Sequence, residues 1–212
     1  MLVERVAGVL LAAGAGSRLG QPKATVELGG EPLAGRGVAL LRAGGAQPIV
    51  IVTGAVAVDL AGVLIVHNPD WRTGMGSSLA AGLATVPDDC GAAVIALVDQ
   101  PLVGPAAVRR LIAAYRAGAG VAVAAYHGAR RNPVLIAREH WPAVTALAVG
   151  DAGARPFLRA HPELVTPVEC GDTGSADDVD TAADLARIAS LAAAAGPRRG
   201  QDAGRDQDQD QA

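Results

Sequence analysis

Aromatic side chains are scarce in this 212-residue sequence, where two tryptophans, two tyrosines and one phenylalanine make up 2% of the residues. Proteins that bind single-stranded nucleic acid stack bases on aromatic rings, so the scarcity argues against that class of function. The formal net charge of −3 argues against polyanionic partners as well. We therefore expect that the protein binds neither nucleic acid nor a membrane surface.

Cysteine is also scarce, with only Cys90 and Cys170 in the whole sequence. The two lie far apart and belong to no Cys-x-x-Cys or cysteine–histidine cluster, which excludes a disulfide framework and a zinc site of the usual spacing. We expect two buried free thiols and a cytoplasmic location, because reducing compartments keep thiols free. No apolar run reaches the ~18 residues of a membrane-spanning helix, and the first apolar run leads directly into a glycine-rich loop instead of a signal-peptide cleavage site.

Hydrophobic residues make up 50% of the sequence and charged residues 18%, which is a globular composition. We expect one domain over residues 1–195. The tail 196–212 contains no apolar residue other than two alanines, and we expect it to be disordered.

Short, continuous apolar runs recur along the chain, with helix-like segments between them. Such runs are typical of strands that are buried on both faces of a parallel sheet, and their alternation with helices predicts a doubly wound α/β fold. The expected strands are Val6–Ala12, Ile49–Val52, Val63–Val66, Ala92–Val98, Val121–Ala124, Asn132–Ile136 and Leu164–Glu169. The expected helices are Leu33–Ala43, Met75–Thr85, Pro105–Arg116, Asp151–Ala160 and Thr181–Ala195.

A glycine-rich loop follows the first expected strand and reads A-A-G-A-G-S-R-L-G-Q-P-K over residues 12–23. Backbone N–H groups of such loops cradle phosphates. The spacing does not fit the Walker loop, because Gly20 is followed by Gln-Pro-Lys and not directly by lysine. It does not fit the G-x-G-x-x-G dinucleotide fingerprint either, because Gly20 comes one residue too late. Lys23 is the only lysine in the sequence. Its compact ammonium suits a phosphoryl oxygen, and a solvated surface charge is the alternative.

A second glycine-containing loop, over residues 68–78, enters an expected helix. The free N–H groups there and the hydroxyls of Ser77 and Ser78 could bind a base or a phosphate, and the alternative is that a serine merely caps the helix.

Acidic residues stand at two further positions of interest. Asp99 follows the expected strand Ala92–Val98, at the end where open α/β sheets bind ligands. Its carboxylate suits Mg²⁺, and capping of the next helix is the alternative. Asp178 and Asp180 precede the last expected helix and could equally complete a metal site or cap that helix.

These segments together resemble the nucleotidyltransferases of Rossmann-like, three-layer fold with a mostly parallel central sheet, and most of all the molybdenum cofactor cytidylyltransferases. The resemblance spans about residues 6–185 and rests on L-A-A-G-x-G-S-R-L-G-x-P-K, N-P-x-W-x-x-G-M-x-S-S-L, D-Q-P, G-x-R-x-N-P-V, G-D-x-G-A-R and D-V-D-T-x-x-D-L. Arg131 stands where the family usually has glycine, and Ala182 and Ala183 replace the usual proline and glutamate. These departures leave open a non-enzymatic carrier or insertion chaperone.

The resemblance implies transfer of CMP from CTP to the phosphate of a molybdopterin-type cofactor, with release of pyrophosphate. It implies Mg²⁺ as a cofactor and a molybdoenzyme of the xanthine dehydrogenase type as a candidate recipient. The guanylyltransferases, which use GTP, are the first alternative, but they tend to open with L-A-G-G where this chain has L-A-A-G. Transfer to another phosphomonoester is the second alternative.

The resemblance also implies roles for individual residues. The nucleotide-binding residues would be Ala12, Ala13, Gly14, Gly16, Ser17, Arg18, Lys23, Gly74, Ser77 and Ser78. The catalytic residues would be Arg18, Lys23 and Asp99, and the metal ligands Asp99, Asp178 and Asp180. The pterin substrate would contact Arg130, Asn132, Asp151 and Arg155.

Overall fold

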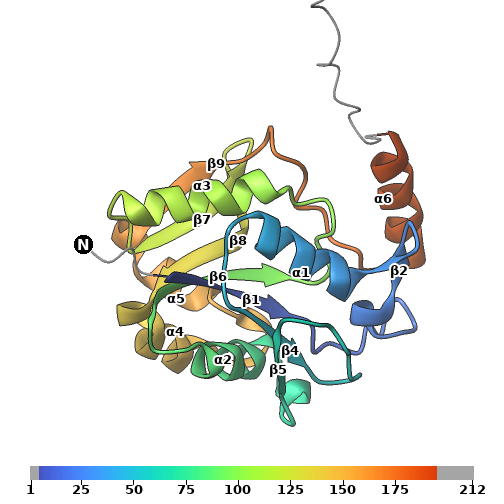
Figure 1. Cartoon of the computed structure of the whole chain (residues 1–212), viewed down its shortest axis with the longest axis horizontal. Helices are drawn as coiled ribbons and strands as arrows, with labels where there is room; N and C mark the ends of the chain where they lie inside the picture. Colours follow the sequence, from blue (N-terminus) through green and yellow to red (C-terminus); the bar gives the residue numbers. More distant parts are fainter. Residues whose placement is uncertain (1–4, 195–212) are drawn as a thin grey trace, which may run out of the picture.

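A seven-stranded sheet forms the centre of the computed structural model, which describes residues 5–194 (Figure 1). The strand order is β5-β4-β1-β6-β8-β7-β9. The strands are β1 (Arg5–Leu11), β4 (Ile49–Thr53), β5 (Leu64–His67), β6 (Cys90–Leu97), β7 (Val121–Tyr126), β8 (Ala129–Ala137) and β9 (Val165–Glu169). All neighbouring pairs are parallel except the two that involve β8. The predicted mostly parallel sheet is confirmed, and the predicted tail 196–212 lies outside the described residues.

Strand β1 shows why the apolar runs are continuous. Val6 and Leu10 belong to the hydrophobic cluster on one side of the sheet, and Ala7 and Val9 belong to the cluster on the other side. Since successive side chains of a strand point to opposite faces, a strand covered on both faces has no position for polar residues.

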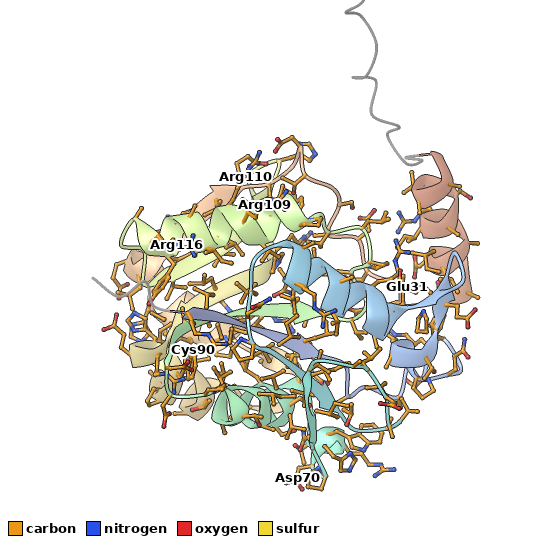
Figure 2. The ribbon with its side chains drawn as sticks, viewed as in Figure 1. Glu31, Asp70, Cys90, Arg109, Arg110 and Arg116 are labelled. Atoms are coloured by element: carbon orange, nitrogen blue, oxygen red, sulfur yellow. The ribbon has the colours of Figure 1, made fainter. Side chains whose placement is uncertain are left out.

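Helices cover both faces of the sheet and make three layers (Figure 1). One face carries α1 (Leu33–Ala43) and α3 (Pro105–Arg116), and the other carries α2 (Met75–Thr85), α4 (Trp141–Leu147) and α5 (Arg155–Ala160). The last helix, α6 (Ala182–Ala194), stands beside the layer of α1 and α3. It contributes the buried Ile188 to the hydrophobic core between that layer and the sheet. Arg109, Arg110 and Arg116 lie along α3 (Figure 2). Within residues 5–194, no helix is long and apolar enough to cross a membrane.

The structure differs from the sequence-based expectation in three short segments. The predicted helix Asp151–Ala160 is wrong in its first part, because Gly150–Ala152 forms a 3₁₀ turn and Gly153 has a φ of +53° that interrupts the helix before Arg155. Helix α4 was not predicted, nor was the small hairpin of β2 (Glu27–Leu28) and β3 (Glu31–Pro32). Each of these hairpin strands has two residues, too few to show an alternating pattern.

Both cysteines are free and buried, as expected. Burial raises the pKa of the Cys90 thiol and of the Cys170 thiol. Both thiols therefore remain protonated at neutral pH and are poor nucleophiles.

The predicted motifs meet at one edge of the sheet, because β1, β4, β5 and β6 are parallel and end there. The glycine-rich loop follows β1, the 68–78 segment follows β5, and Asp99 follows β6. Strand β8 runs in the opposite direction, and Val134 and Ile95 are the last residues that pair, so residues 130–132 continue past this last pair toward the same edge.

Candidate active site

The loop after β1 owes its shape to Gly16. The Gly16 carbonyl accepts hydrogen bonds from the N–H groups of Leu19 and Gly20, both at 2.9 Å. Gly16 has a φ of +61°, and a Cβ atom there would lie 2.0 Å from the carbonyl oxygen of Gln21. Only glycine fits this position, so the turn depends on it. The turn leaves Gly14, Ser17 and Arg18 exposed to solvent beside the edge of the sheet.

Ala12 and Ala13 are buried and present mainly their backbone. The Ala12 N–H donates to the Val52 carbonyl and the Ala13 carbonyl accepts from the Ala55 N–H, both at 2.9 Å. A Cβ atom on Gly54 would lie 2.8 Å from the Ala13 oxygen. The two alanines therefore form a tightly packed floor at the start of the glycine-rich loop.

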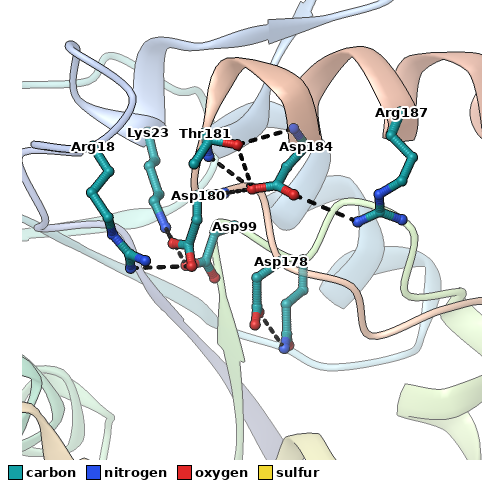
Figure 3. Close-up of polar contacts among 9 residues, drawn as sticks. Arg18, Lys23, Asp99, Asp178, Asp180, Thr181, Asp184 and Arg187 are labelled. Carbon is teal, nitrogen blue, oxygen red and sulfur yellow. Dashed lines mark hydrogen bonds and ion pairs between the residues drawn. The ribbon is translucent and has the colours of Figure 1, made fainter.

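Lys23 joins two carboxylates, those of Asp99 and Asp180, that lie far apart in the sequence. Its Nζ atom lies 2.8 Å from Asp99 Oδ2 and 2.6 Å from Asp180 Oδ1. Arg18 adds a second cation, with Nη2 3.1 Å from Asp180 Oδ2. The four side chains point toward one another in Figure 3. Burial acts to lower the pKa of Lys23, but the charges and hydrogen bonds of both carboxylates outweigh it, and the pKa is raised.

Asp99 has one carboxylate oxygen that no group in the described chain satisfies. Its Oδ1 atom is buried without a hydrogen-bond partner, while Oδ2 accepts from Lys23. The alternative that Asp99 caps α3 is wrong, because Gly104 is the N-cap residue and no side chain caps this helix. A buried carboxylate oxygen without a partner is costly, and it is an acceptor for a cation or for a donor that arrives with a ligand.

The start of α6 is capped by Thr181 and Asp184. The Asp184 N–H donates to Thr181 Oγ1 at 3.2 Å, and the Thr181 N–H donates back to Asp184 Oδ2 at 2.9 Å, which is a capping box. The alternative that Asp178 and Asp180 cap this helix is therefore wrong. Asp180 is available to Lys23 and Arg18.

Asp178 lies apart from the Lys23 ion pairs in Figure 3. Its Oδ1 atom accepts a hydrogen bond of 2.9 Å from Gln100 Nε2. Burial raises the pKa of Asp178; the Gln100 hydrogen bond opposes this shift, and the nearby charges of Asp99 and Asp180 add to it.

Among the residues that the structure describes, no three histidine, cysteine or acidic side chains converge tightly enough to hold a metal ion by themselves. Asp178 is thus not gathered into one ligand set with Asp99 and Asp180. Mg²⁺, however, prefers one or two carboxylates together with substrate phosphates over a cage made only of protein ligands. The Asp99–Asp180 pair, with its unsatisfied oxygen, fits that kind of site.

The hydroxyls of Ser77 and Ser78 face inward. Asn68 Nδ2 donates to Ser77 Oγ at 2.9 Å and to Ser78 Oγ at 3.0 Å, and Ser77 Oγ also lies 2.9 Å from the Gly74 carbonyl oxygen. Neither serine caps α2 through its side chain. Both hydroxyls thus brace the loop before α2, so a ligand could use the backbone N–H groups of this segment more readily than the hydroxyls that the sequence pointed to.

The start of α2 packs backbone against backbone on the segment between α4 and α5. A Cβ atom on Gly76 would lie 2.0 Å from the Ala148 carbonyl oxygen, and one on Gly74 would lie 2.3 Å from the Gly150 carbonyl carbon. Arg155 donates to the Asp151 carbonyl at 2.8 Å, so its guanidinium braces its own loop. Asp151 is exposed on this loop.

Arg130 and Asn132, predicted to contact the pterin, lie on the part of β8 that continues past its last pair with β6. Arg130 is exposed and Asn132 is half-buried. The structure places them at the same edge of the sheet as Asp99, on strands β8 and β6 that are neighbours.

Two buried polar residues at this edge were missed by the sequence reasoning. Asn68 is 3% exposed and Gln100 is 5% exposed. The signal that could have found them is a polar residue within a few positions of the end of an apolar run, where a buried polar group needs a hydrogen-bond partner to be stable.

Residues 8–165 match the MobA-like NTP transferase domain. Nicotine blue oxidoreductase of Paenarthrobacter nicotinovorans is 40% identical over 197 residues, which cover 86% of this chain and 96% of that protein. Molybdenum cofactor guanylyltransferase of Xanthomonas euvesicatoria pv. vesicatoria is 39% identical over 106 residues, which cover 50% of this chain and 53% of that protein.

Solved structures extend the similarity to the whole fold. The Mycobacterium sp. strain JC1 homologue of Mycobacterium tuberculosis Rv0371c has a TM-score of 0.80 at 31% identity, over 91% of this chain and 98% of that chain. Rv0371c in complex with manganese has a TM-score of 0.72 at 27% identity, over 88% and 98% of the two chains. The loop after β1, Lys23 and Asp99 all fall inside the matched region 8–165. This chain is a member of the MobA-like NTP transferase domain family.

Proposed function

We propose that this protein transfers CMP from CTP to the phosphate of the molybdenum cofactor and releases pyrophosphate. The observation that carries the proposal is the position of Lys23 and Arg18 beside the glycine-rich loop, where they face Asp99 and Asp180. Nucleotidyl transfer needs cations for the phosphates and acidic groups for a divalent ion, and this cluster supplies both. Membership in the nucleotidyltransferase family supports the same reaction class.

The glycine-rich loop is the proposed triphosphate site. Gly14, Gly16 and Ser17 would offer backbone N–H groups to the phosphates, since the turn at Gly16 keeps this part of the loop open to solvent. Arg18, whose side chain is 71% exposed, is free to turn from Asp180 toward a phosphate. Lys23 would exchange carboxylate partners for phosphoryl oxygens. Ala12 and Ala13 would meet the base through their backbone.

Asp99 and Asp180 are the proposed ligands of Mg²⁺. The buried Oδ1 atom of Asp99 offers the ion an acceptor that no hydrogen-bond donor of the described residues occupies. When bound, the ion would neutralise phosphate charge and polarise the α-phosphate. The manganese complex of Rv0371c supports a divalent ion in a protein of this fold.

No general base is required by this proposal. The attacking phosphate monoester is already anionic at neutral pH, so the chain has only to bind it and align it with the α-phosphorus. We call Asp99, Asp178 and Asp180 the acidic cluster. Its hydrogen bonds and ion pairs involve Lys23, Arg18 and Gln100 and not histidine.

The proposed pterin site is formed by the start of β8 and the loop before α5. Arg130 and Asn132 on β8 and Asp151 on the loop before α5 would contact the pterin directly. Arg155 acts through its loop, because its guanidinium is bound to backbone carbonyl groups. An anionic pterin would be attracted to the exposed arginines of β8.

The choice of CTP over GTP rests on the L-A-A-G sequence, and a molybdoenzyme of the xanthine dehydrogenase type is the proposed recipient of the product. We propose the cytoplasm as the location, and one catalytic domain over residues 1–195.

The decisive experiment supplies purified protein with molybdopterin, Mg²⁺ and each of CTP, GTP, ATP and UTP in turn. Pyrophosphate release is measured, and the dinucleotide is identified by mass spectrometry. We expect release with CTP above the other nucleotides, together with the cytosine dinucleotide. Pyrophosphate release with GTP alone would show that the nucleotide substrate is GTP and not CTP. No release with any nucleotide would refute nucleotidyl transfer to this substrate.

A second candidate function follows from the relative that is 40% identical over 86% of this chain, nicotine blue oxidoreductase. Under this alternative the same edge of the sheet would hold a redox substrate in place of a triphosphate. The loop after β1 lacks the G-x-G-x-x-G spacing of dinucleotide-binding proteins, which favours the transferase. Bleaching of nicotine blue with NADH or NADPH, measured beside the pyrophosphate assay, separates the two functions.

A further inference from the structure

Gln100 belongs to the small group of polar side chains that are fully buried among residues 5–194. Its Nε2 atom donates to the Ala176 carbonyl at 3.2 Å and to Asp178 Oδ1 at 2.9 Å. A backbone carbonyl can only accept a hydrogen bond, so it fixes which end of the amide faces it. The Gln100 amide must therefore present N–H groups, and not its own oxygen, to both partners.

The hydrogen bonds of Gln100 join two chain segments that are far apart in sequence. The Val179 N–H donates to the Asp99 carbonyl at 2.8 Å, and the Ser175 N–H donates to the Leu102 carbonyl at 3.1 Å. Gln100 supplies the side-chain bonds between these two backbone contacts. The turn after β6 and the segment that carries Asp178 are thus held as one unit, and Gln100 is the part of it that touches a carboxylate.

Apolar packing does not by itself hold Gln100 in place. Gln100 and Pro101 line a cavity of about 260 Å³ between α1 and the turn after β6, together with Leu33, Leu40 and Val103. Space on this side would let the turn after β6 shift if its hydrogen bonds were removed. The amide bonds to Ala176 and Asp178 therefore add to the backbone bonds from Val179 and Ser175 in holding the turn.

We propose that Gln100 is a positioning residue that holds the Asp178 carboxylate beside Asp99 and Asp180 and thereby strengthens divalent-cation binding at the edge of the sheet. This inference rests on the proposed function only in expecting a divalent cation there, and not on the identity of the nucleotide or the acceptor. Asp99 and Asp180 would contact the ion. Asp178 would not contact it and would act through its charge and its ordered position. Partners of this outer kind typically change metal affinity about 10- to 100-fold when they are removed.

The test is a titration of the full chain with Mn²⁺ alone, in which free Mn²⁺ is counted by electron paramagnetic resonance. Gln100→Leu introduces an apolar side chain of similar size and removes the donor, and we expect about tenfold weaker binding. Gln100→Glu places a carboxylate against two acceptors, and we expect still weaker binding. Arg187→Met is the matched control, since Arg187 pairs with Asp177 and Asp184 in the same segment without touching Asp178. It should bind Mn²⁺ as the unmodified protein does.

A double-variant cycle separates positioning from a merely structural role. If Gln100 acts through Asp178, Gln100→Leu combined with Asp178→Asn should bind Mn²⁺ no more weakly than Asp178→Asn alone. Additive losses, or Mn²⁺ binding by a folded Gln100→Leu at the unmodified strength, would overturn the inference, as would unmodified protein that does not bind Mn²⁺. Should Gln100→Leu fail to fold, Gln100→Met replaces it. A failed pyrophosphate assay leaves this result standing, because the titration contains no nucleotide.

Discussion

Lys23 Nζ and Asp180 Oδ1 lie 2.6 Å apart, although 157 positions separate the two residues in the chain. Lys23 follows the loop after the first strand, and Asp180 precedes the last helix. The acidic cluster is therefore complete only when the segment before α6 has docked against the sheet. A site assembled from both ends of the chain couples ligand binding to the folding of the whole described region.

The first prediction concerns this lysine. Lys23→Ala should lower kcat/KM for CTP about 100-fold or more, a loss comparable to removing one strong electrostatic group from a transition state. Part of the loss should appear in kcat, because charge grows on the departing pyrophosphate during the reaction. Lys23→Arg should restore activity only in part, since a planar fork does not replace a compact ammonium. Kinetics with CTP and pterin varied separately provide the measurement; a change confined to the pterin KM would remove Lys23 from the triphosphate site.

The second prediction concerns Asp99. Asp99→Asn keeps the shape of the side chain and loses its charge, so transfer should fall about 100-fold or more while the melting temperature stays close to that of the unmodified protein. Asp88→Asn is the control, because Asp88 stands just before the opposite end of β6 and is fully exposed. Activity of Asp99→Asn within about threefold of the control would exclude Asp99 from the metal site.

The third prediction concerns pH and Glu169. Glu169 Oε1 accepts from the N–H groups of Gly171 at 2.9 Å and His127 at 3.1 Å, and Oε2 accepts from Gly128 at 3.3 Å. These bonds, with that from Gly171 the largest cause, lower the pKa of Glu169. A depressed carboxyl pKa stabilises the fold above the unfolded value of about 4.3, and this stabilisation is lost as pH falls through the lower folded pKa.

Unfolding measured from pH 7 to pH 3 tests this prediction on the unmodified protein and Glu169→Gln. Glutamine cannot accept at both positions, so the variant should be less stable at pH 7, and the difference should shrink as the pH falls below 4. A difference that stays constant across this range would show that the charge of Glu169 does not contribute.

The fourth prediction compares two helix glycines. Gly76→Ala should lower the free energy of unfolding by more than about 2 kcal/mol, because over-packing costs about 1–3 kcal/mol and the new Cβ atom would meet the Ala148 carbonyl oxygen at 2.0 Å. Gly35→Ala places its Cβ atom only against the flexible Glu31 side chain, at 3.4 Å. It should be neutral or stabilising by up to ~1 kcal/mol, since alanine favours helix over glycine. Chemical denaturation of both variants measures the contrast, and equal effects would contradict it.

The sheet and its main helices were predictable because their signals are local. The continuous apolar run of β1 reports burial on both faces, and the proline of α3 marks the first turn of that helix. The roles of Asp178 and Asp180 were not predictable, because an aspartate before a helix suits a cap and a metal site equally well. The structure separates the two roles only through Thr181 and Asp184, which form the cap themselves.

The candidate site was predictable as a set of motifs and not as a set of contacts. The sequence places Ser77 and Ser78 at the start of a helix, but it cannot show that Asn68 turns both hydroxyls inward. Likewise, nothing local links Gln100 to Asp178, since the contact depends on how the segment before α6 crosses the end of β6. Contacts between distant segments are a property of the packed fold.

The ion pairs of Lys23 have a consequence for the covalent chemistry of the protein. Lys23 carries the only side-chain amine in the sequence, and that side chain is only 16% exposed. Reagents that acylate amines therefore find no accessible lysine on the described surface, and an enzyme that builds isopeptide bonds finds no lysine there to tag. The rate of acylation of Lys23, measured by mass spectrometry, would show how often its amine leaves the ion pairs with Asp99 and Asp180. Any lysine-directed label that does attach would do so at the cost of the cluster itself.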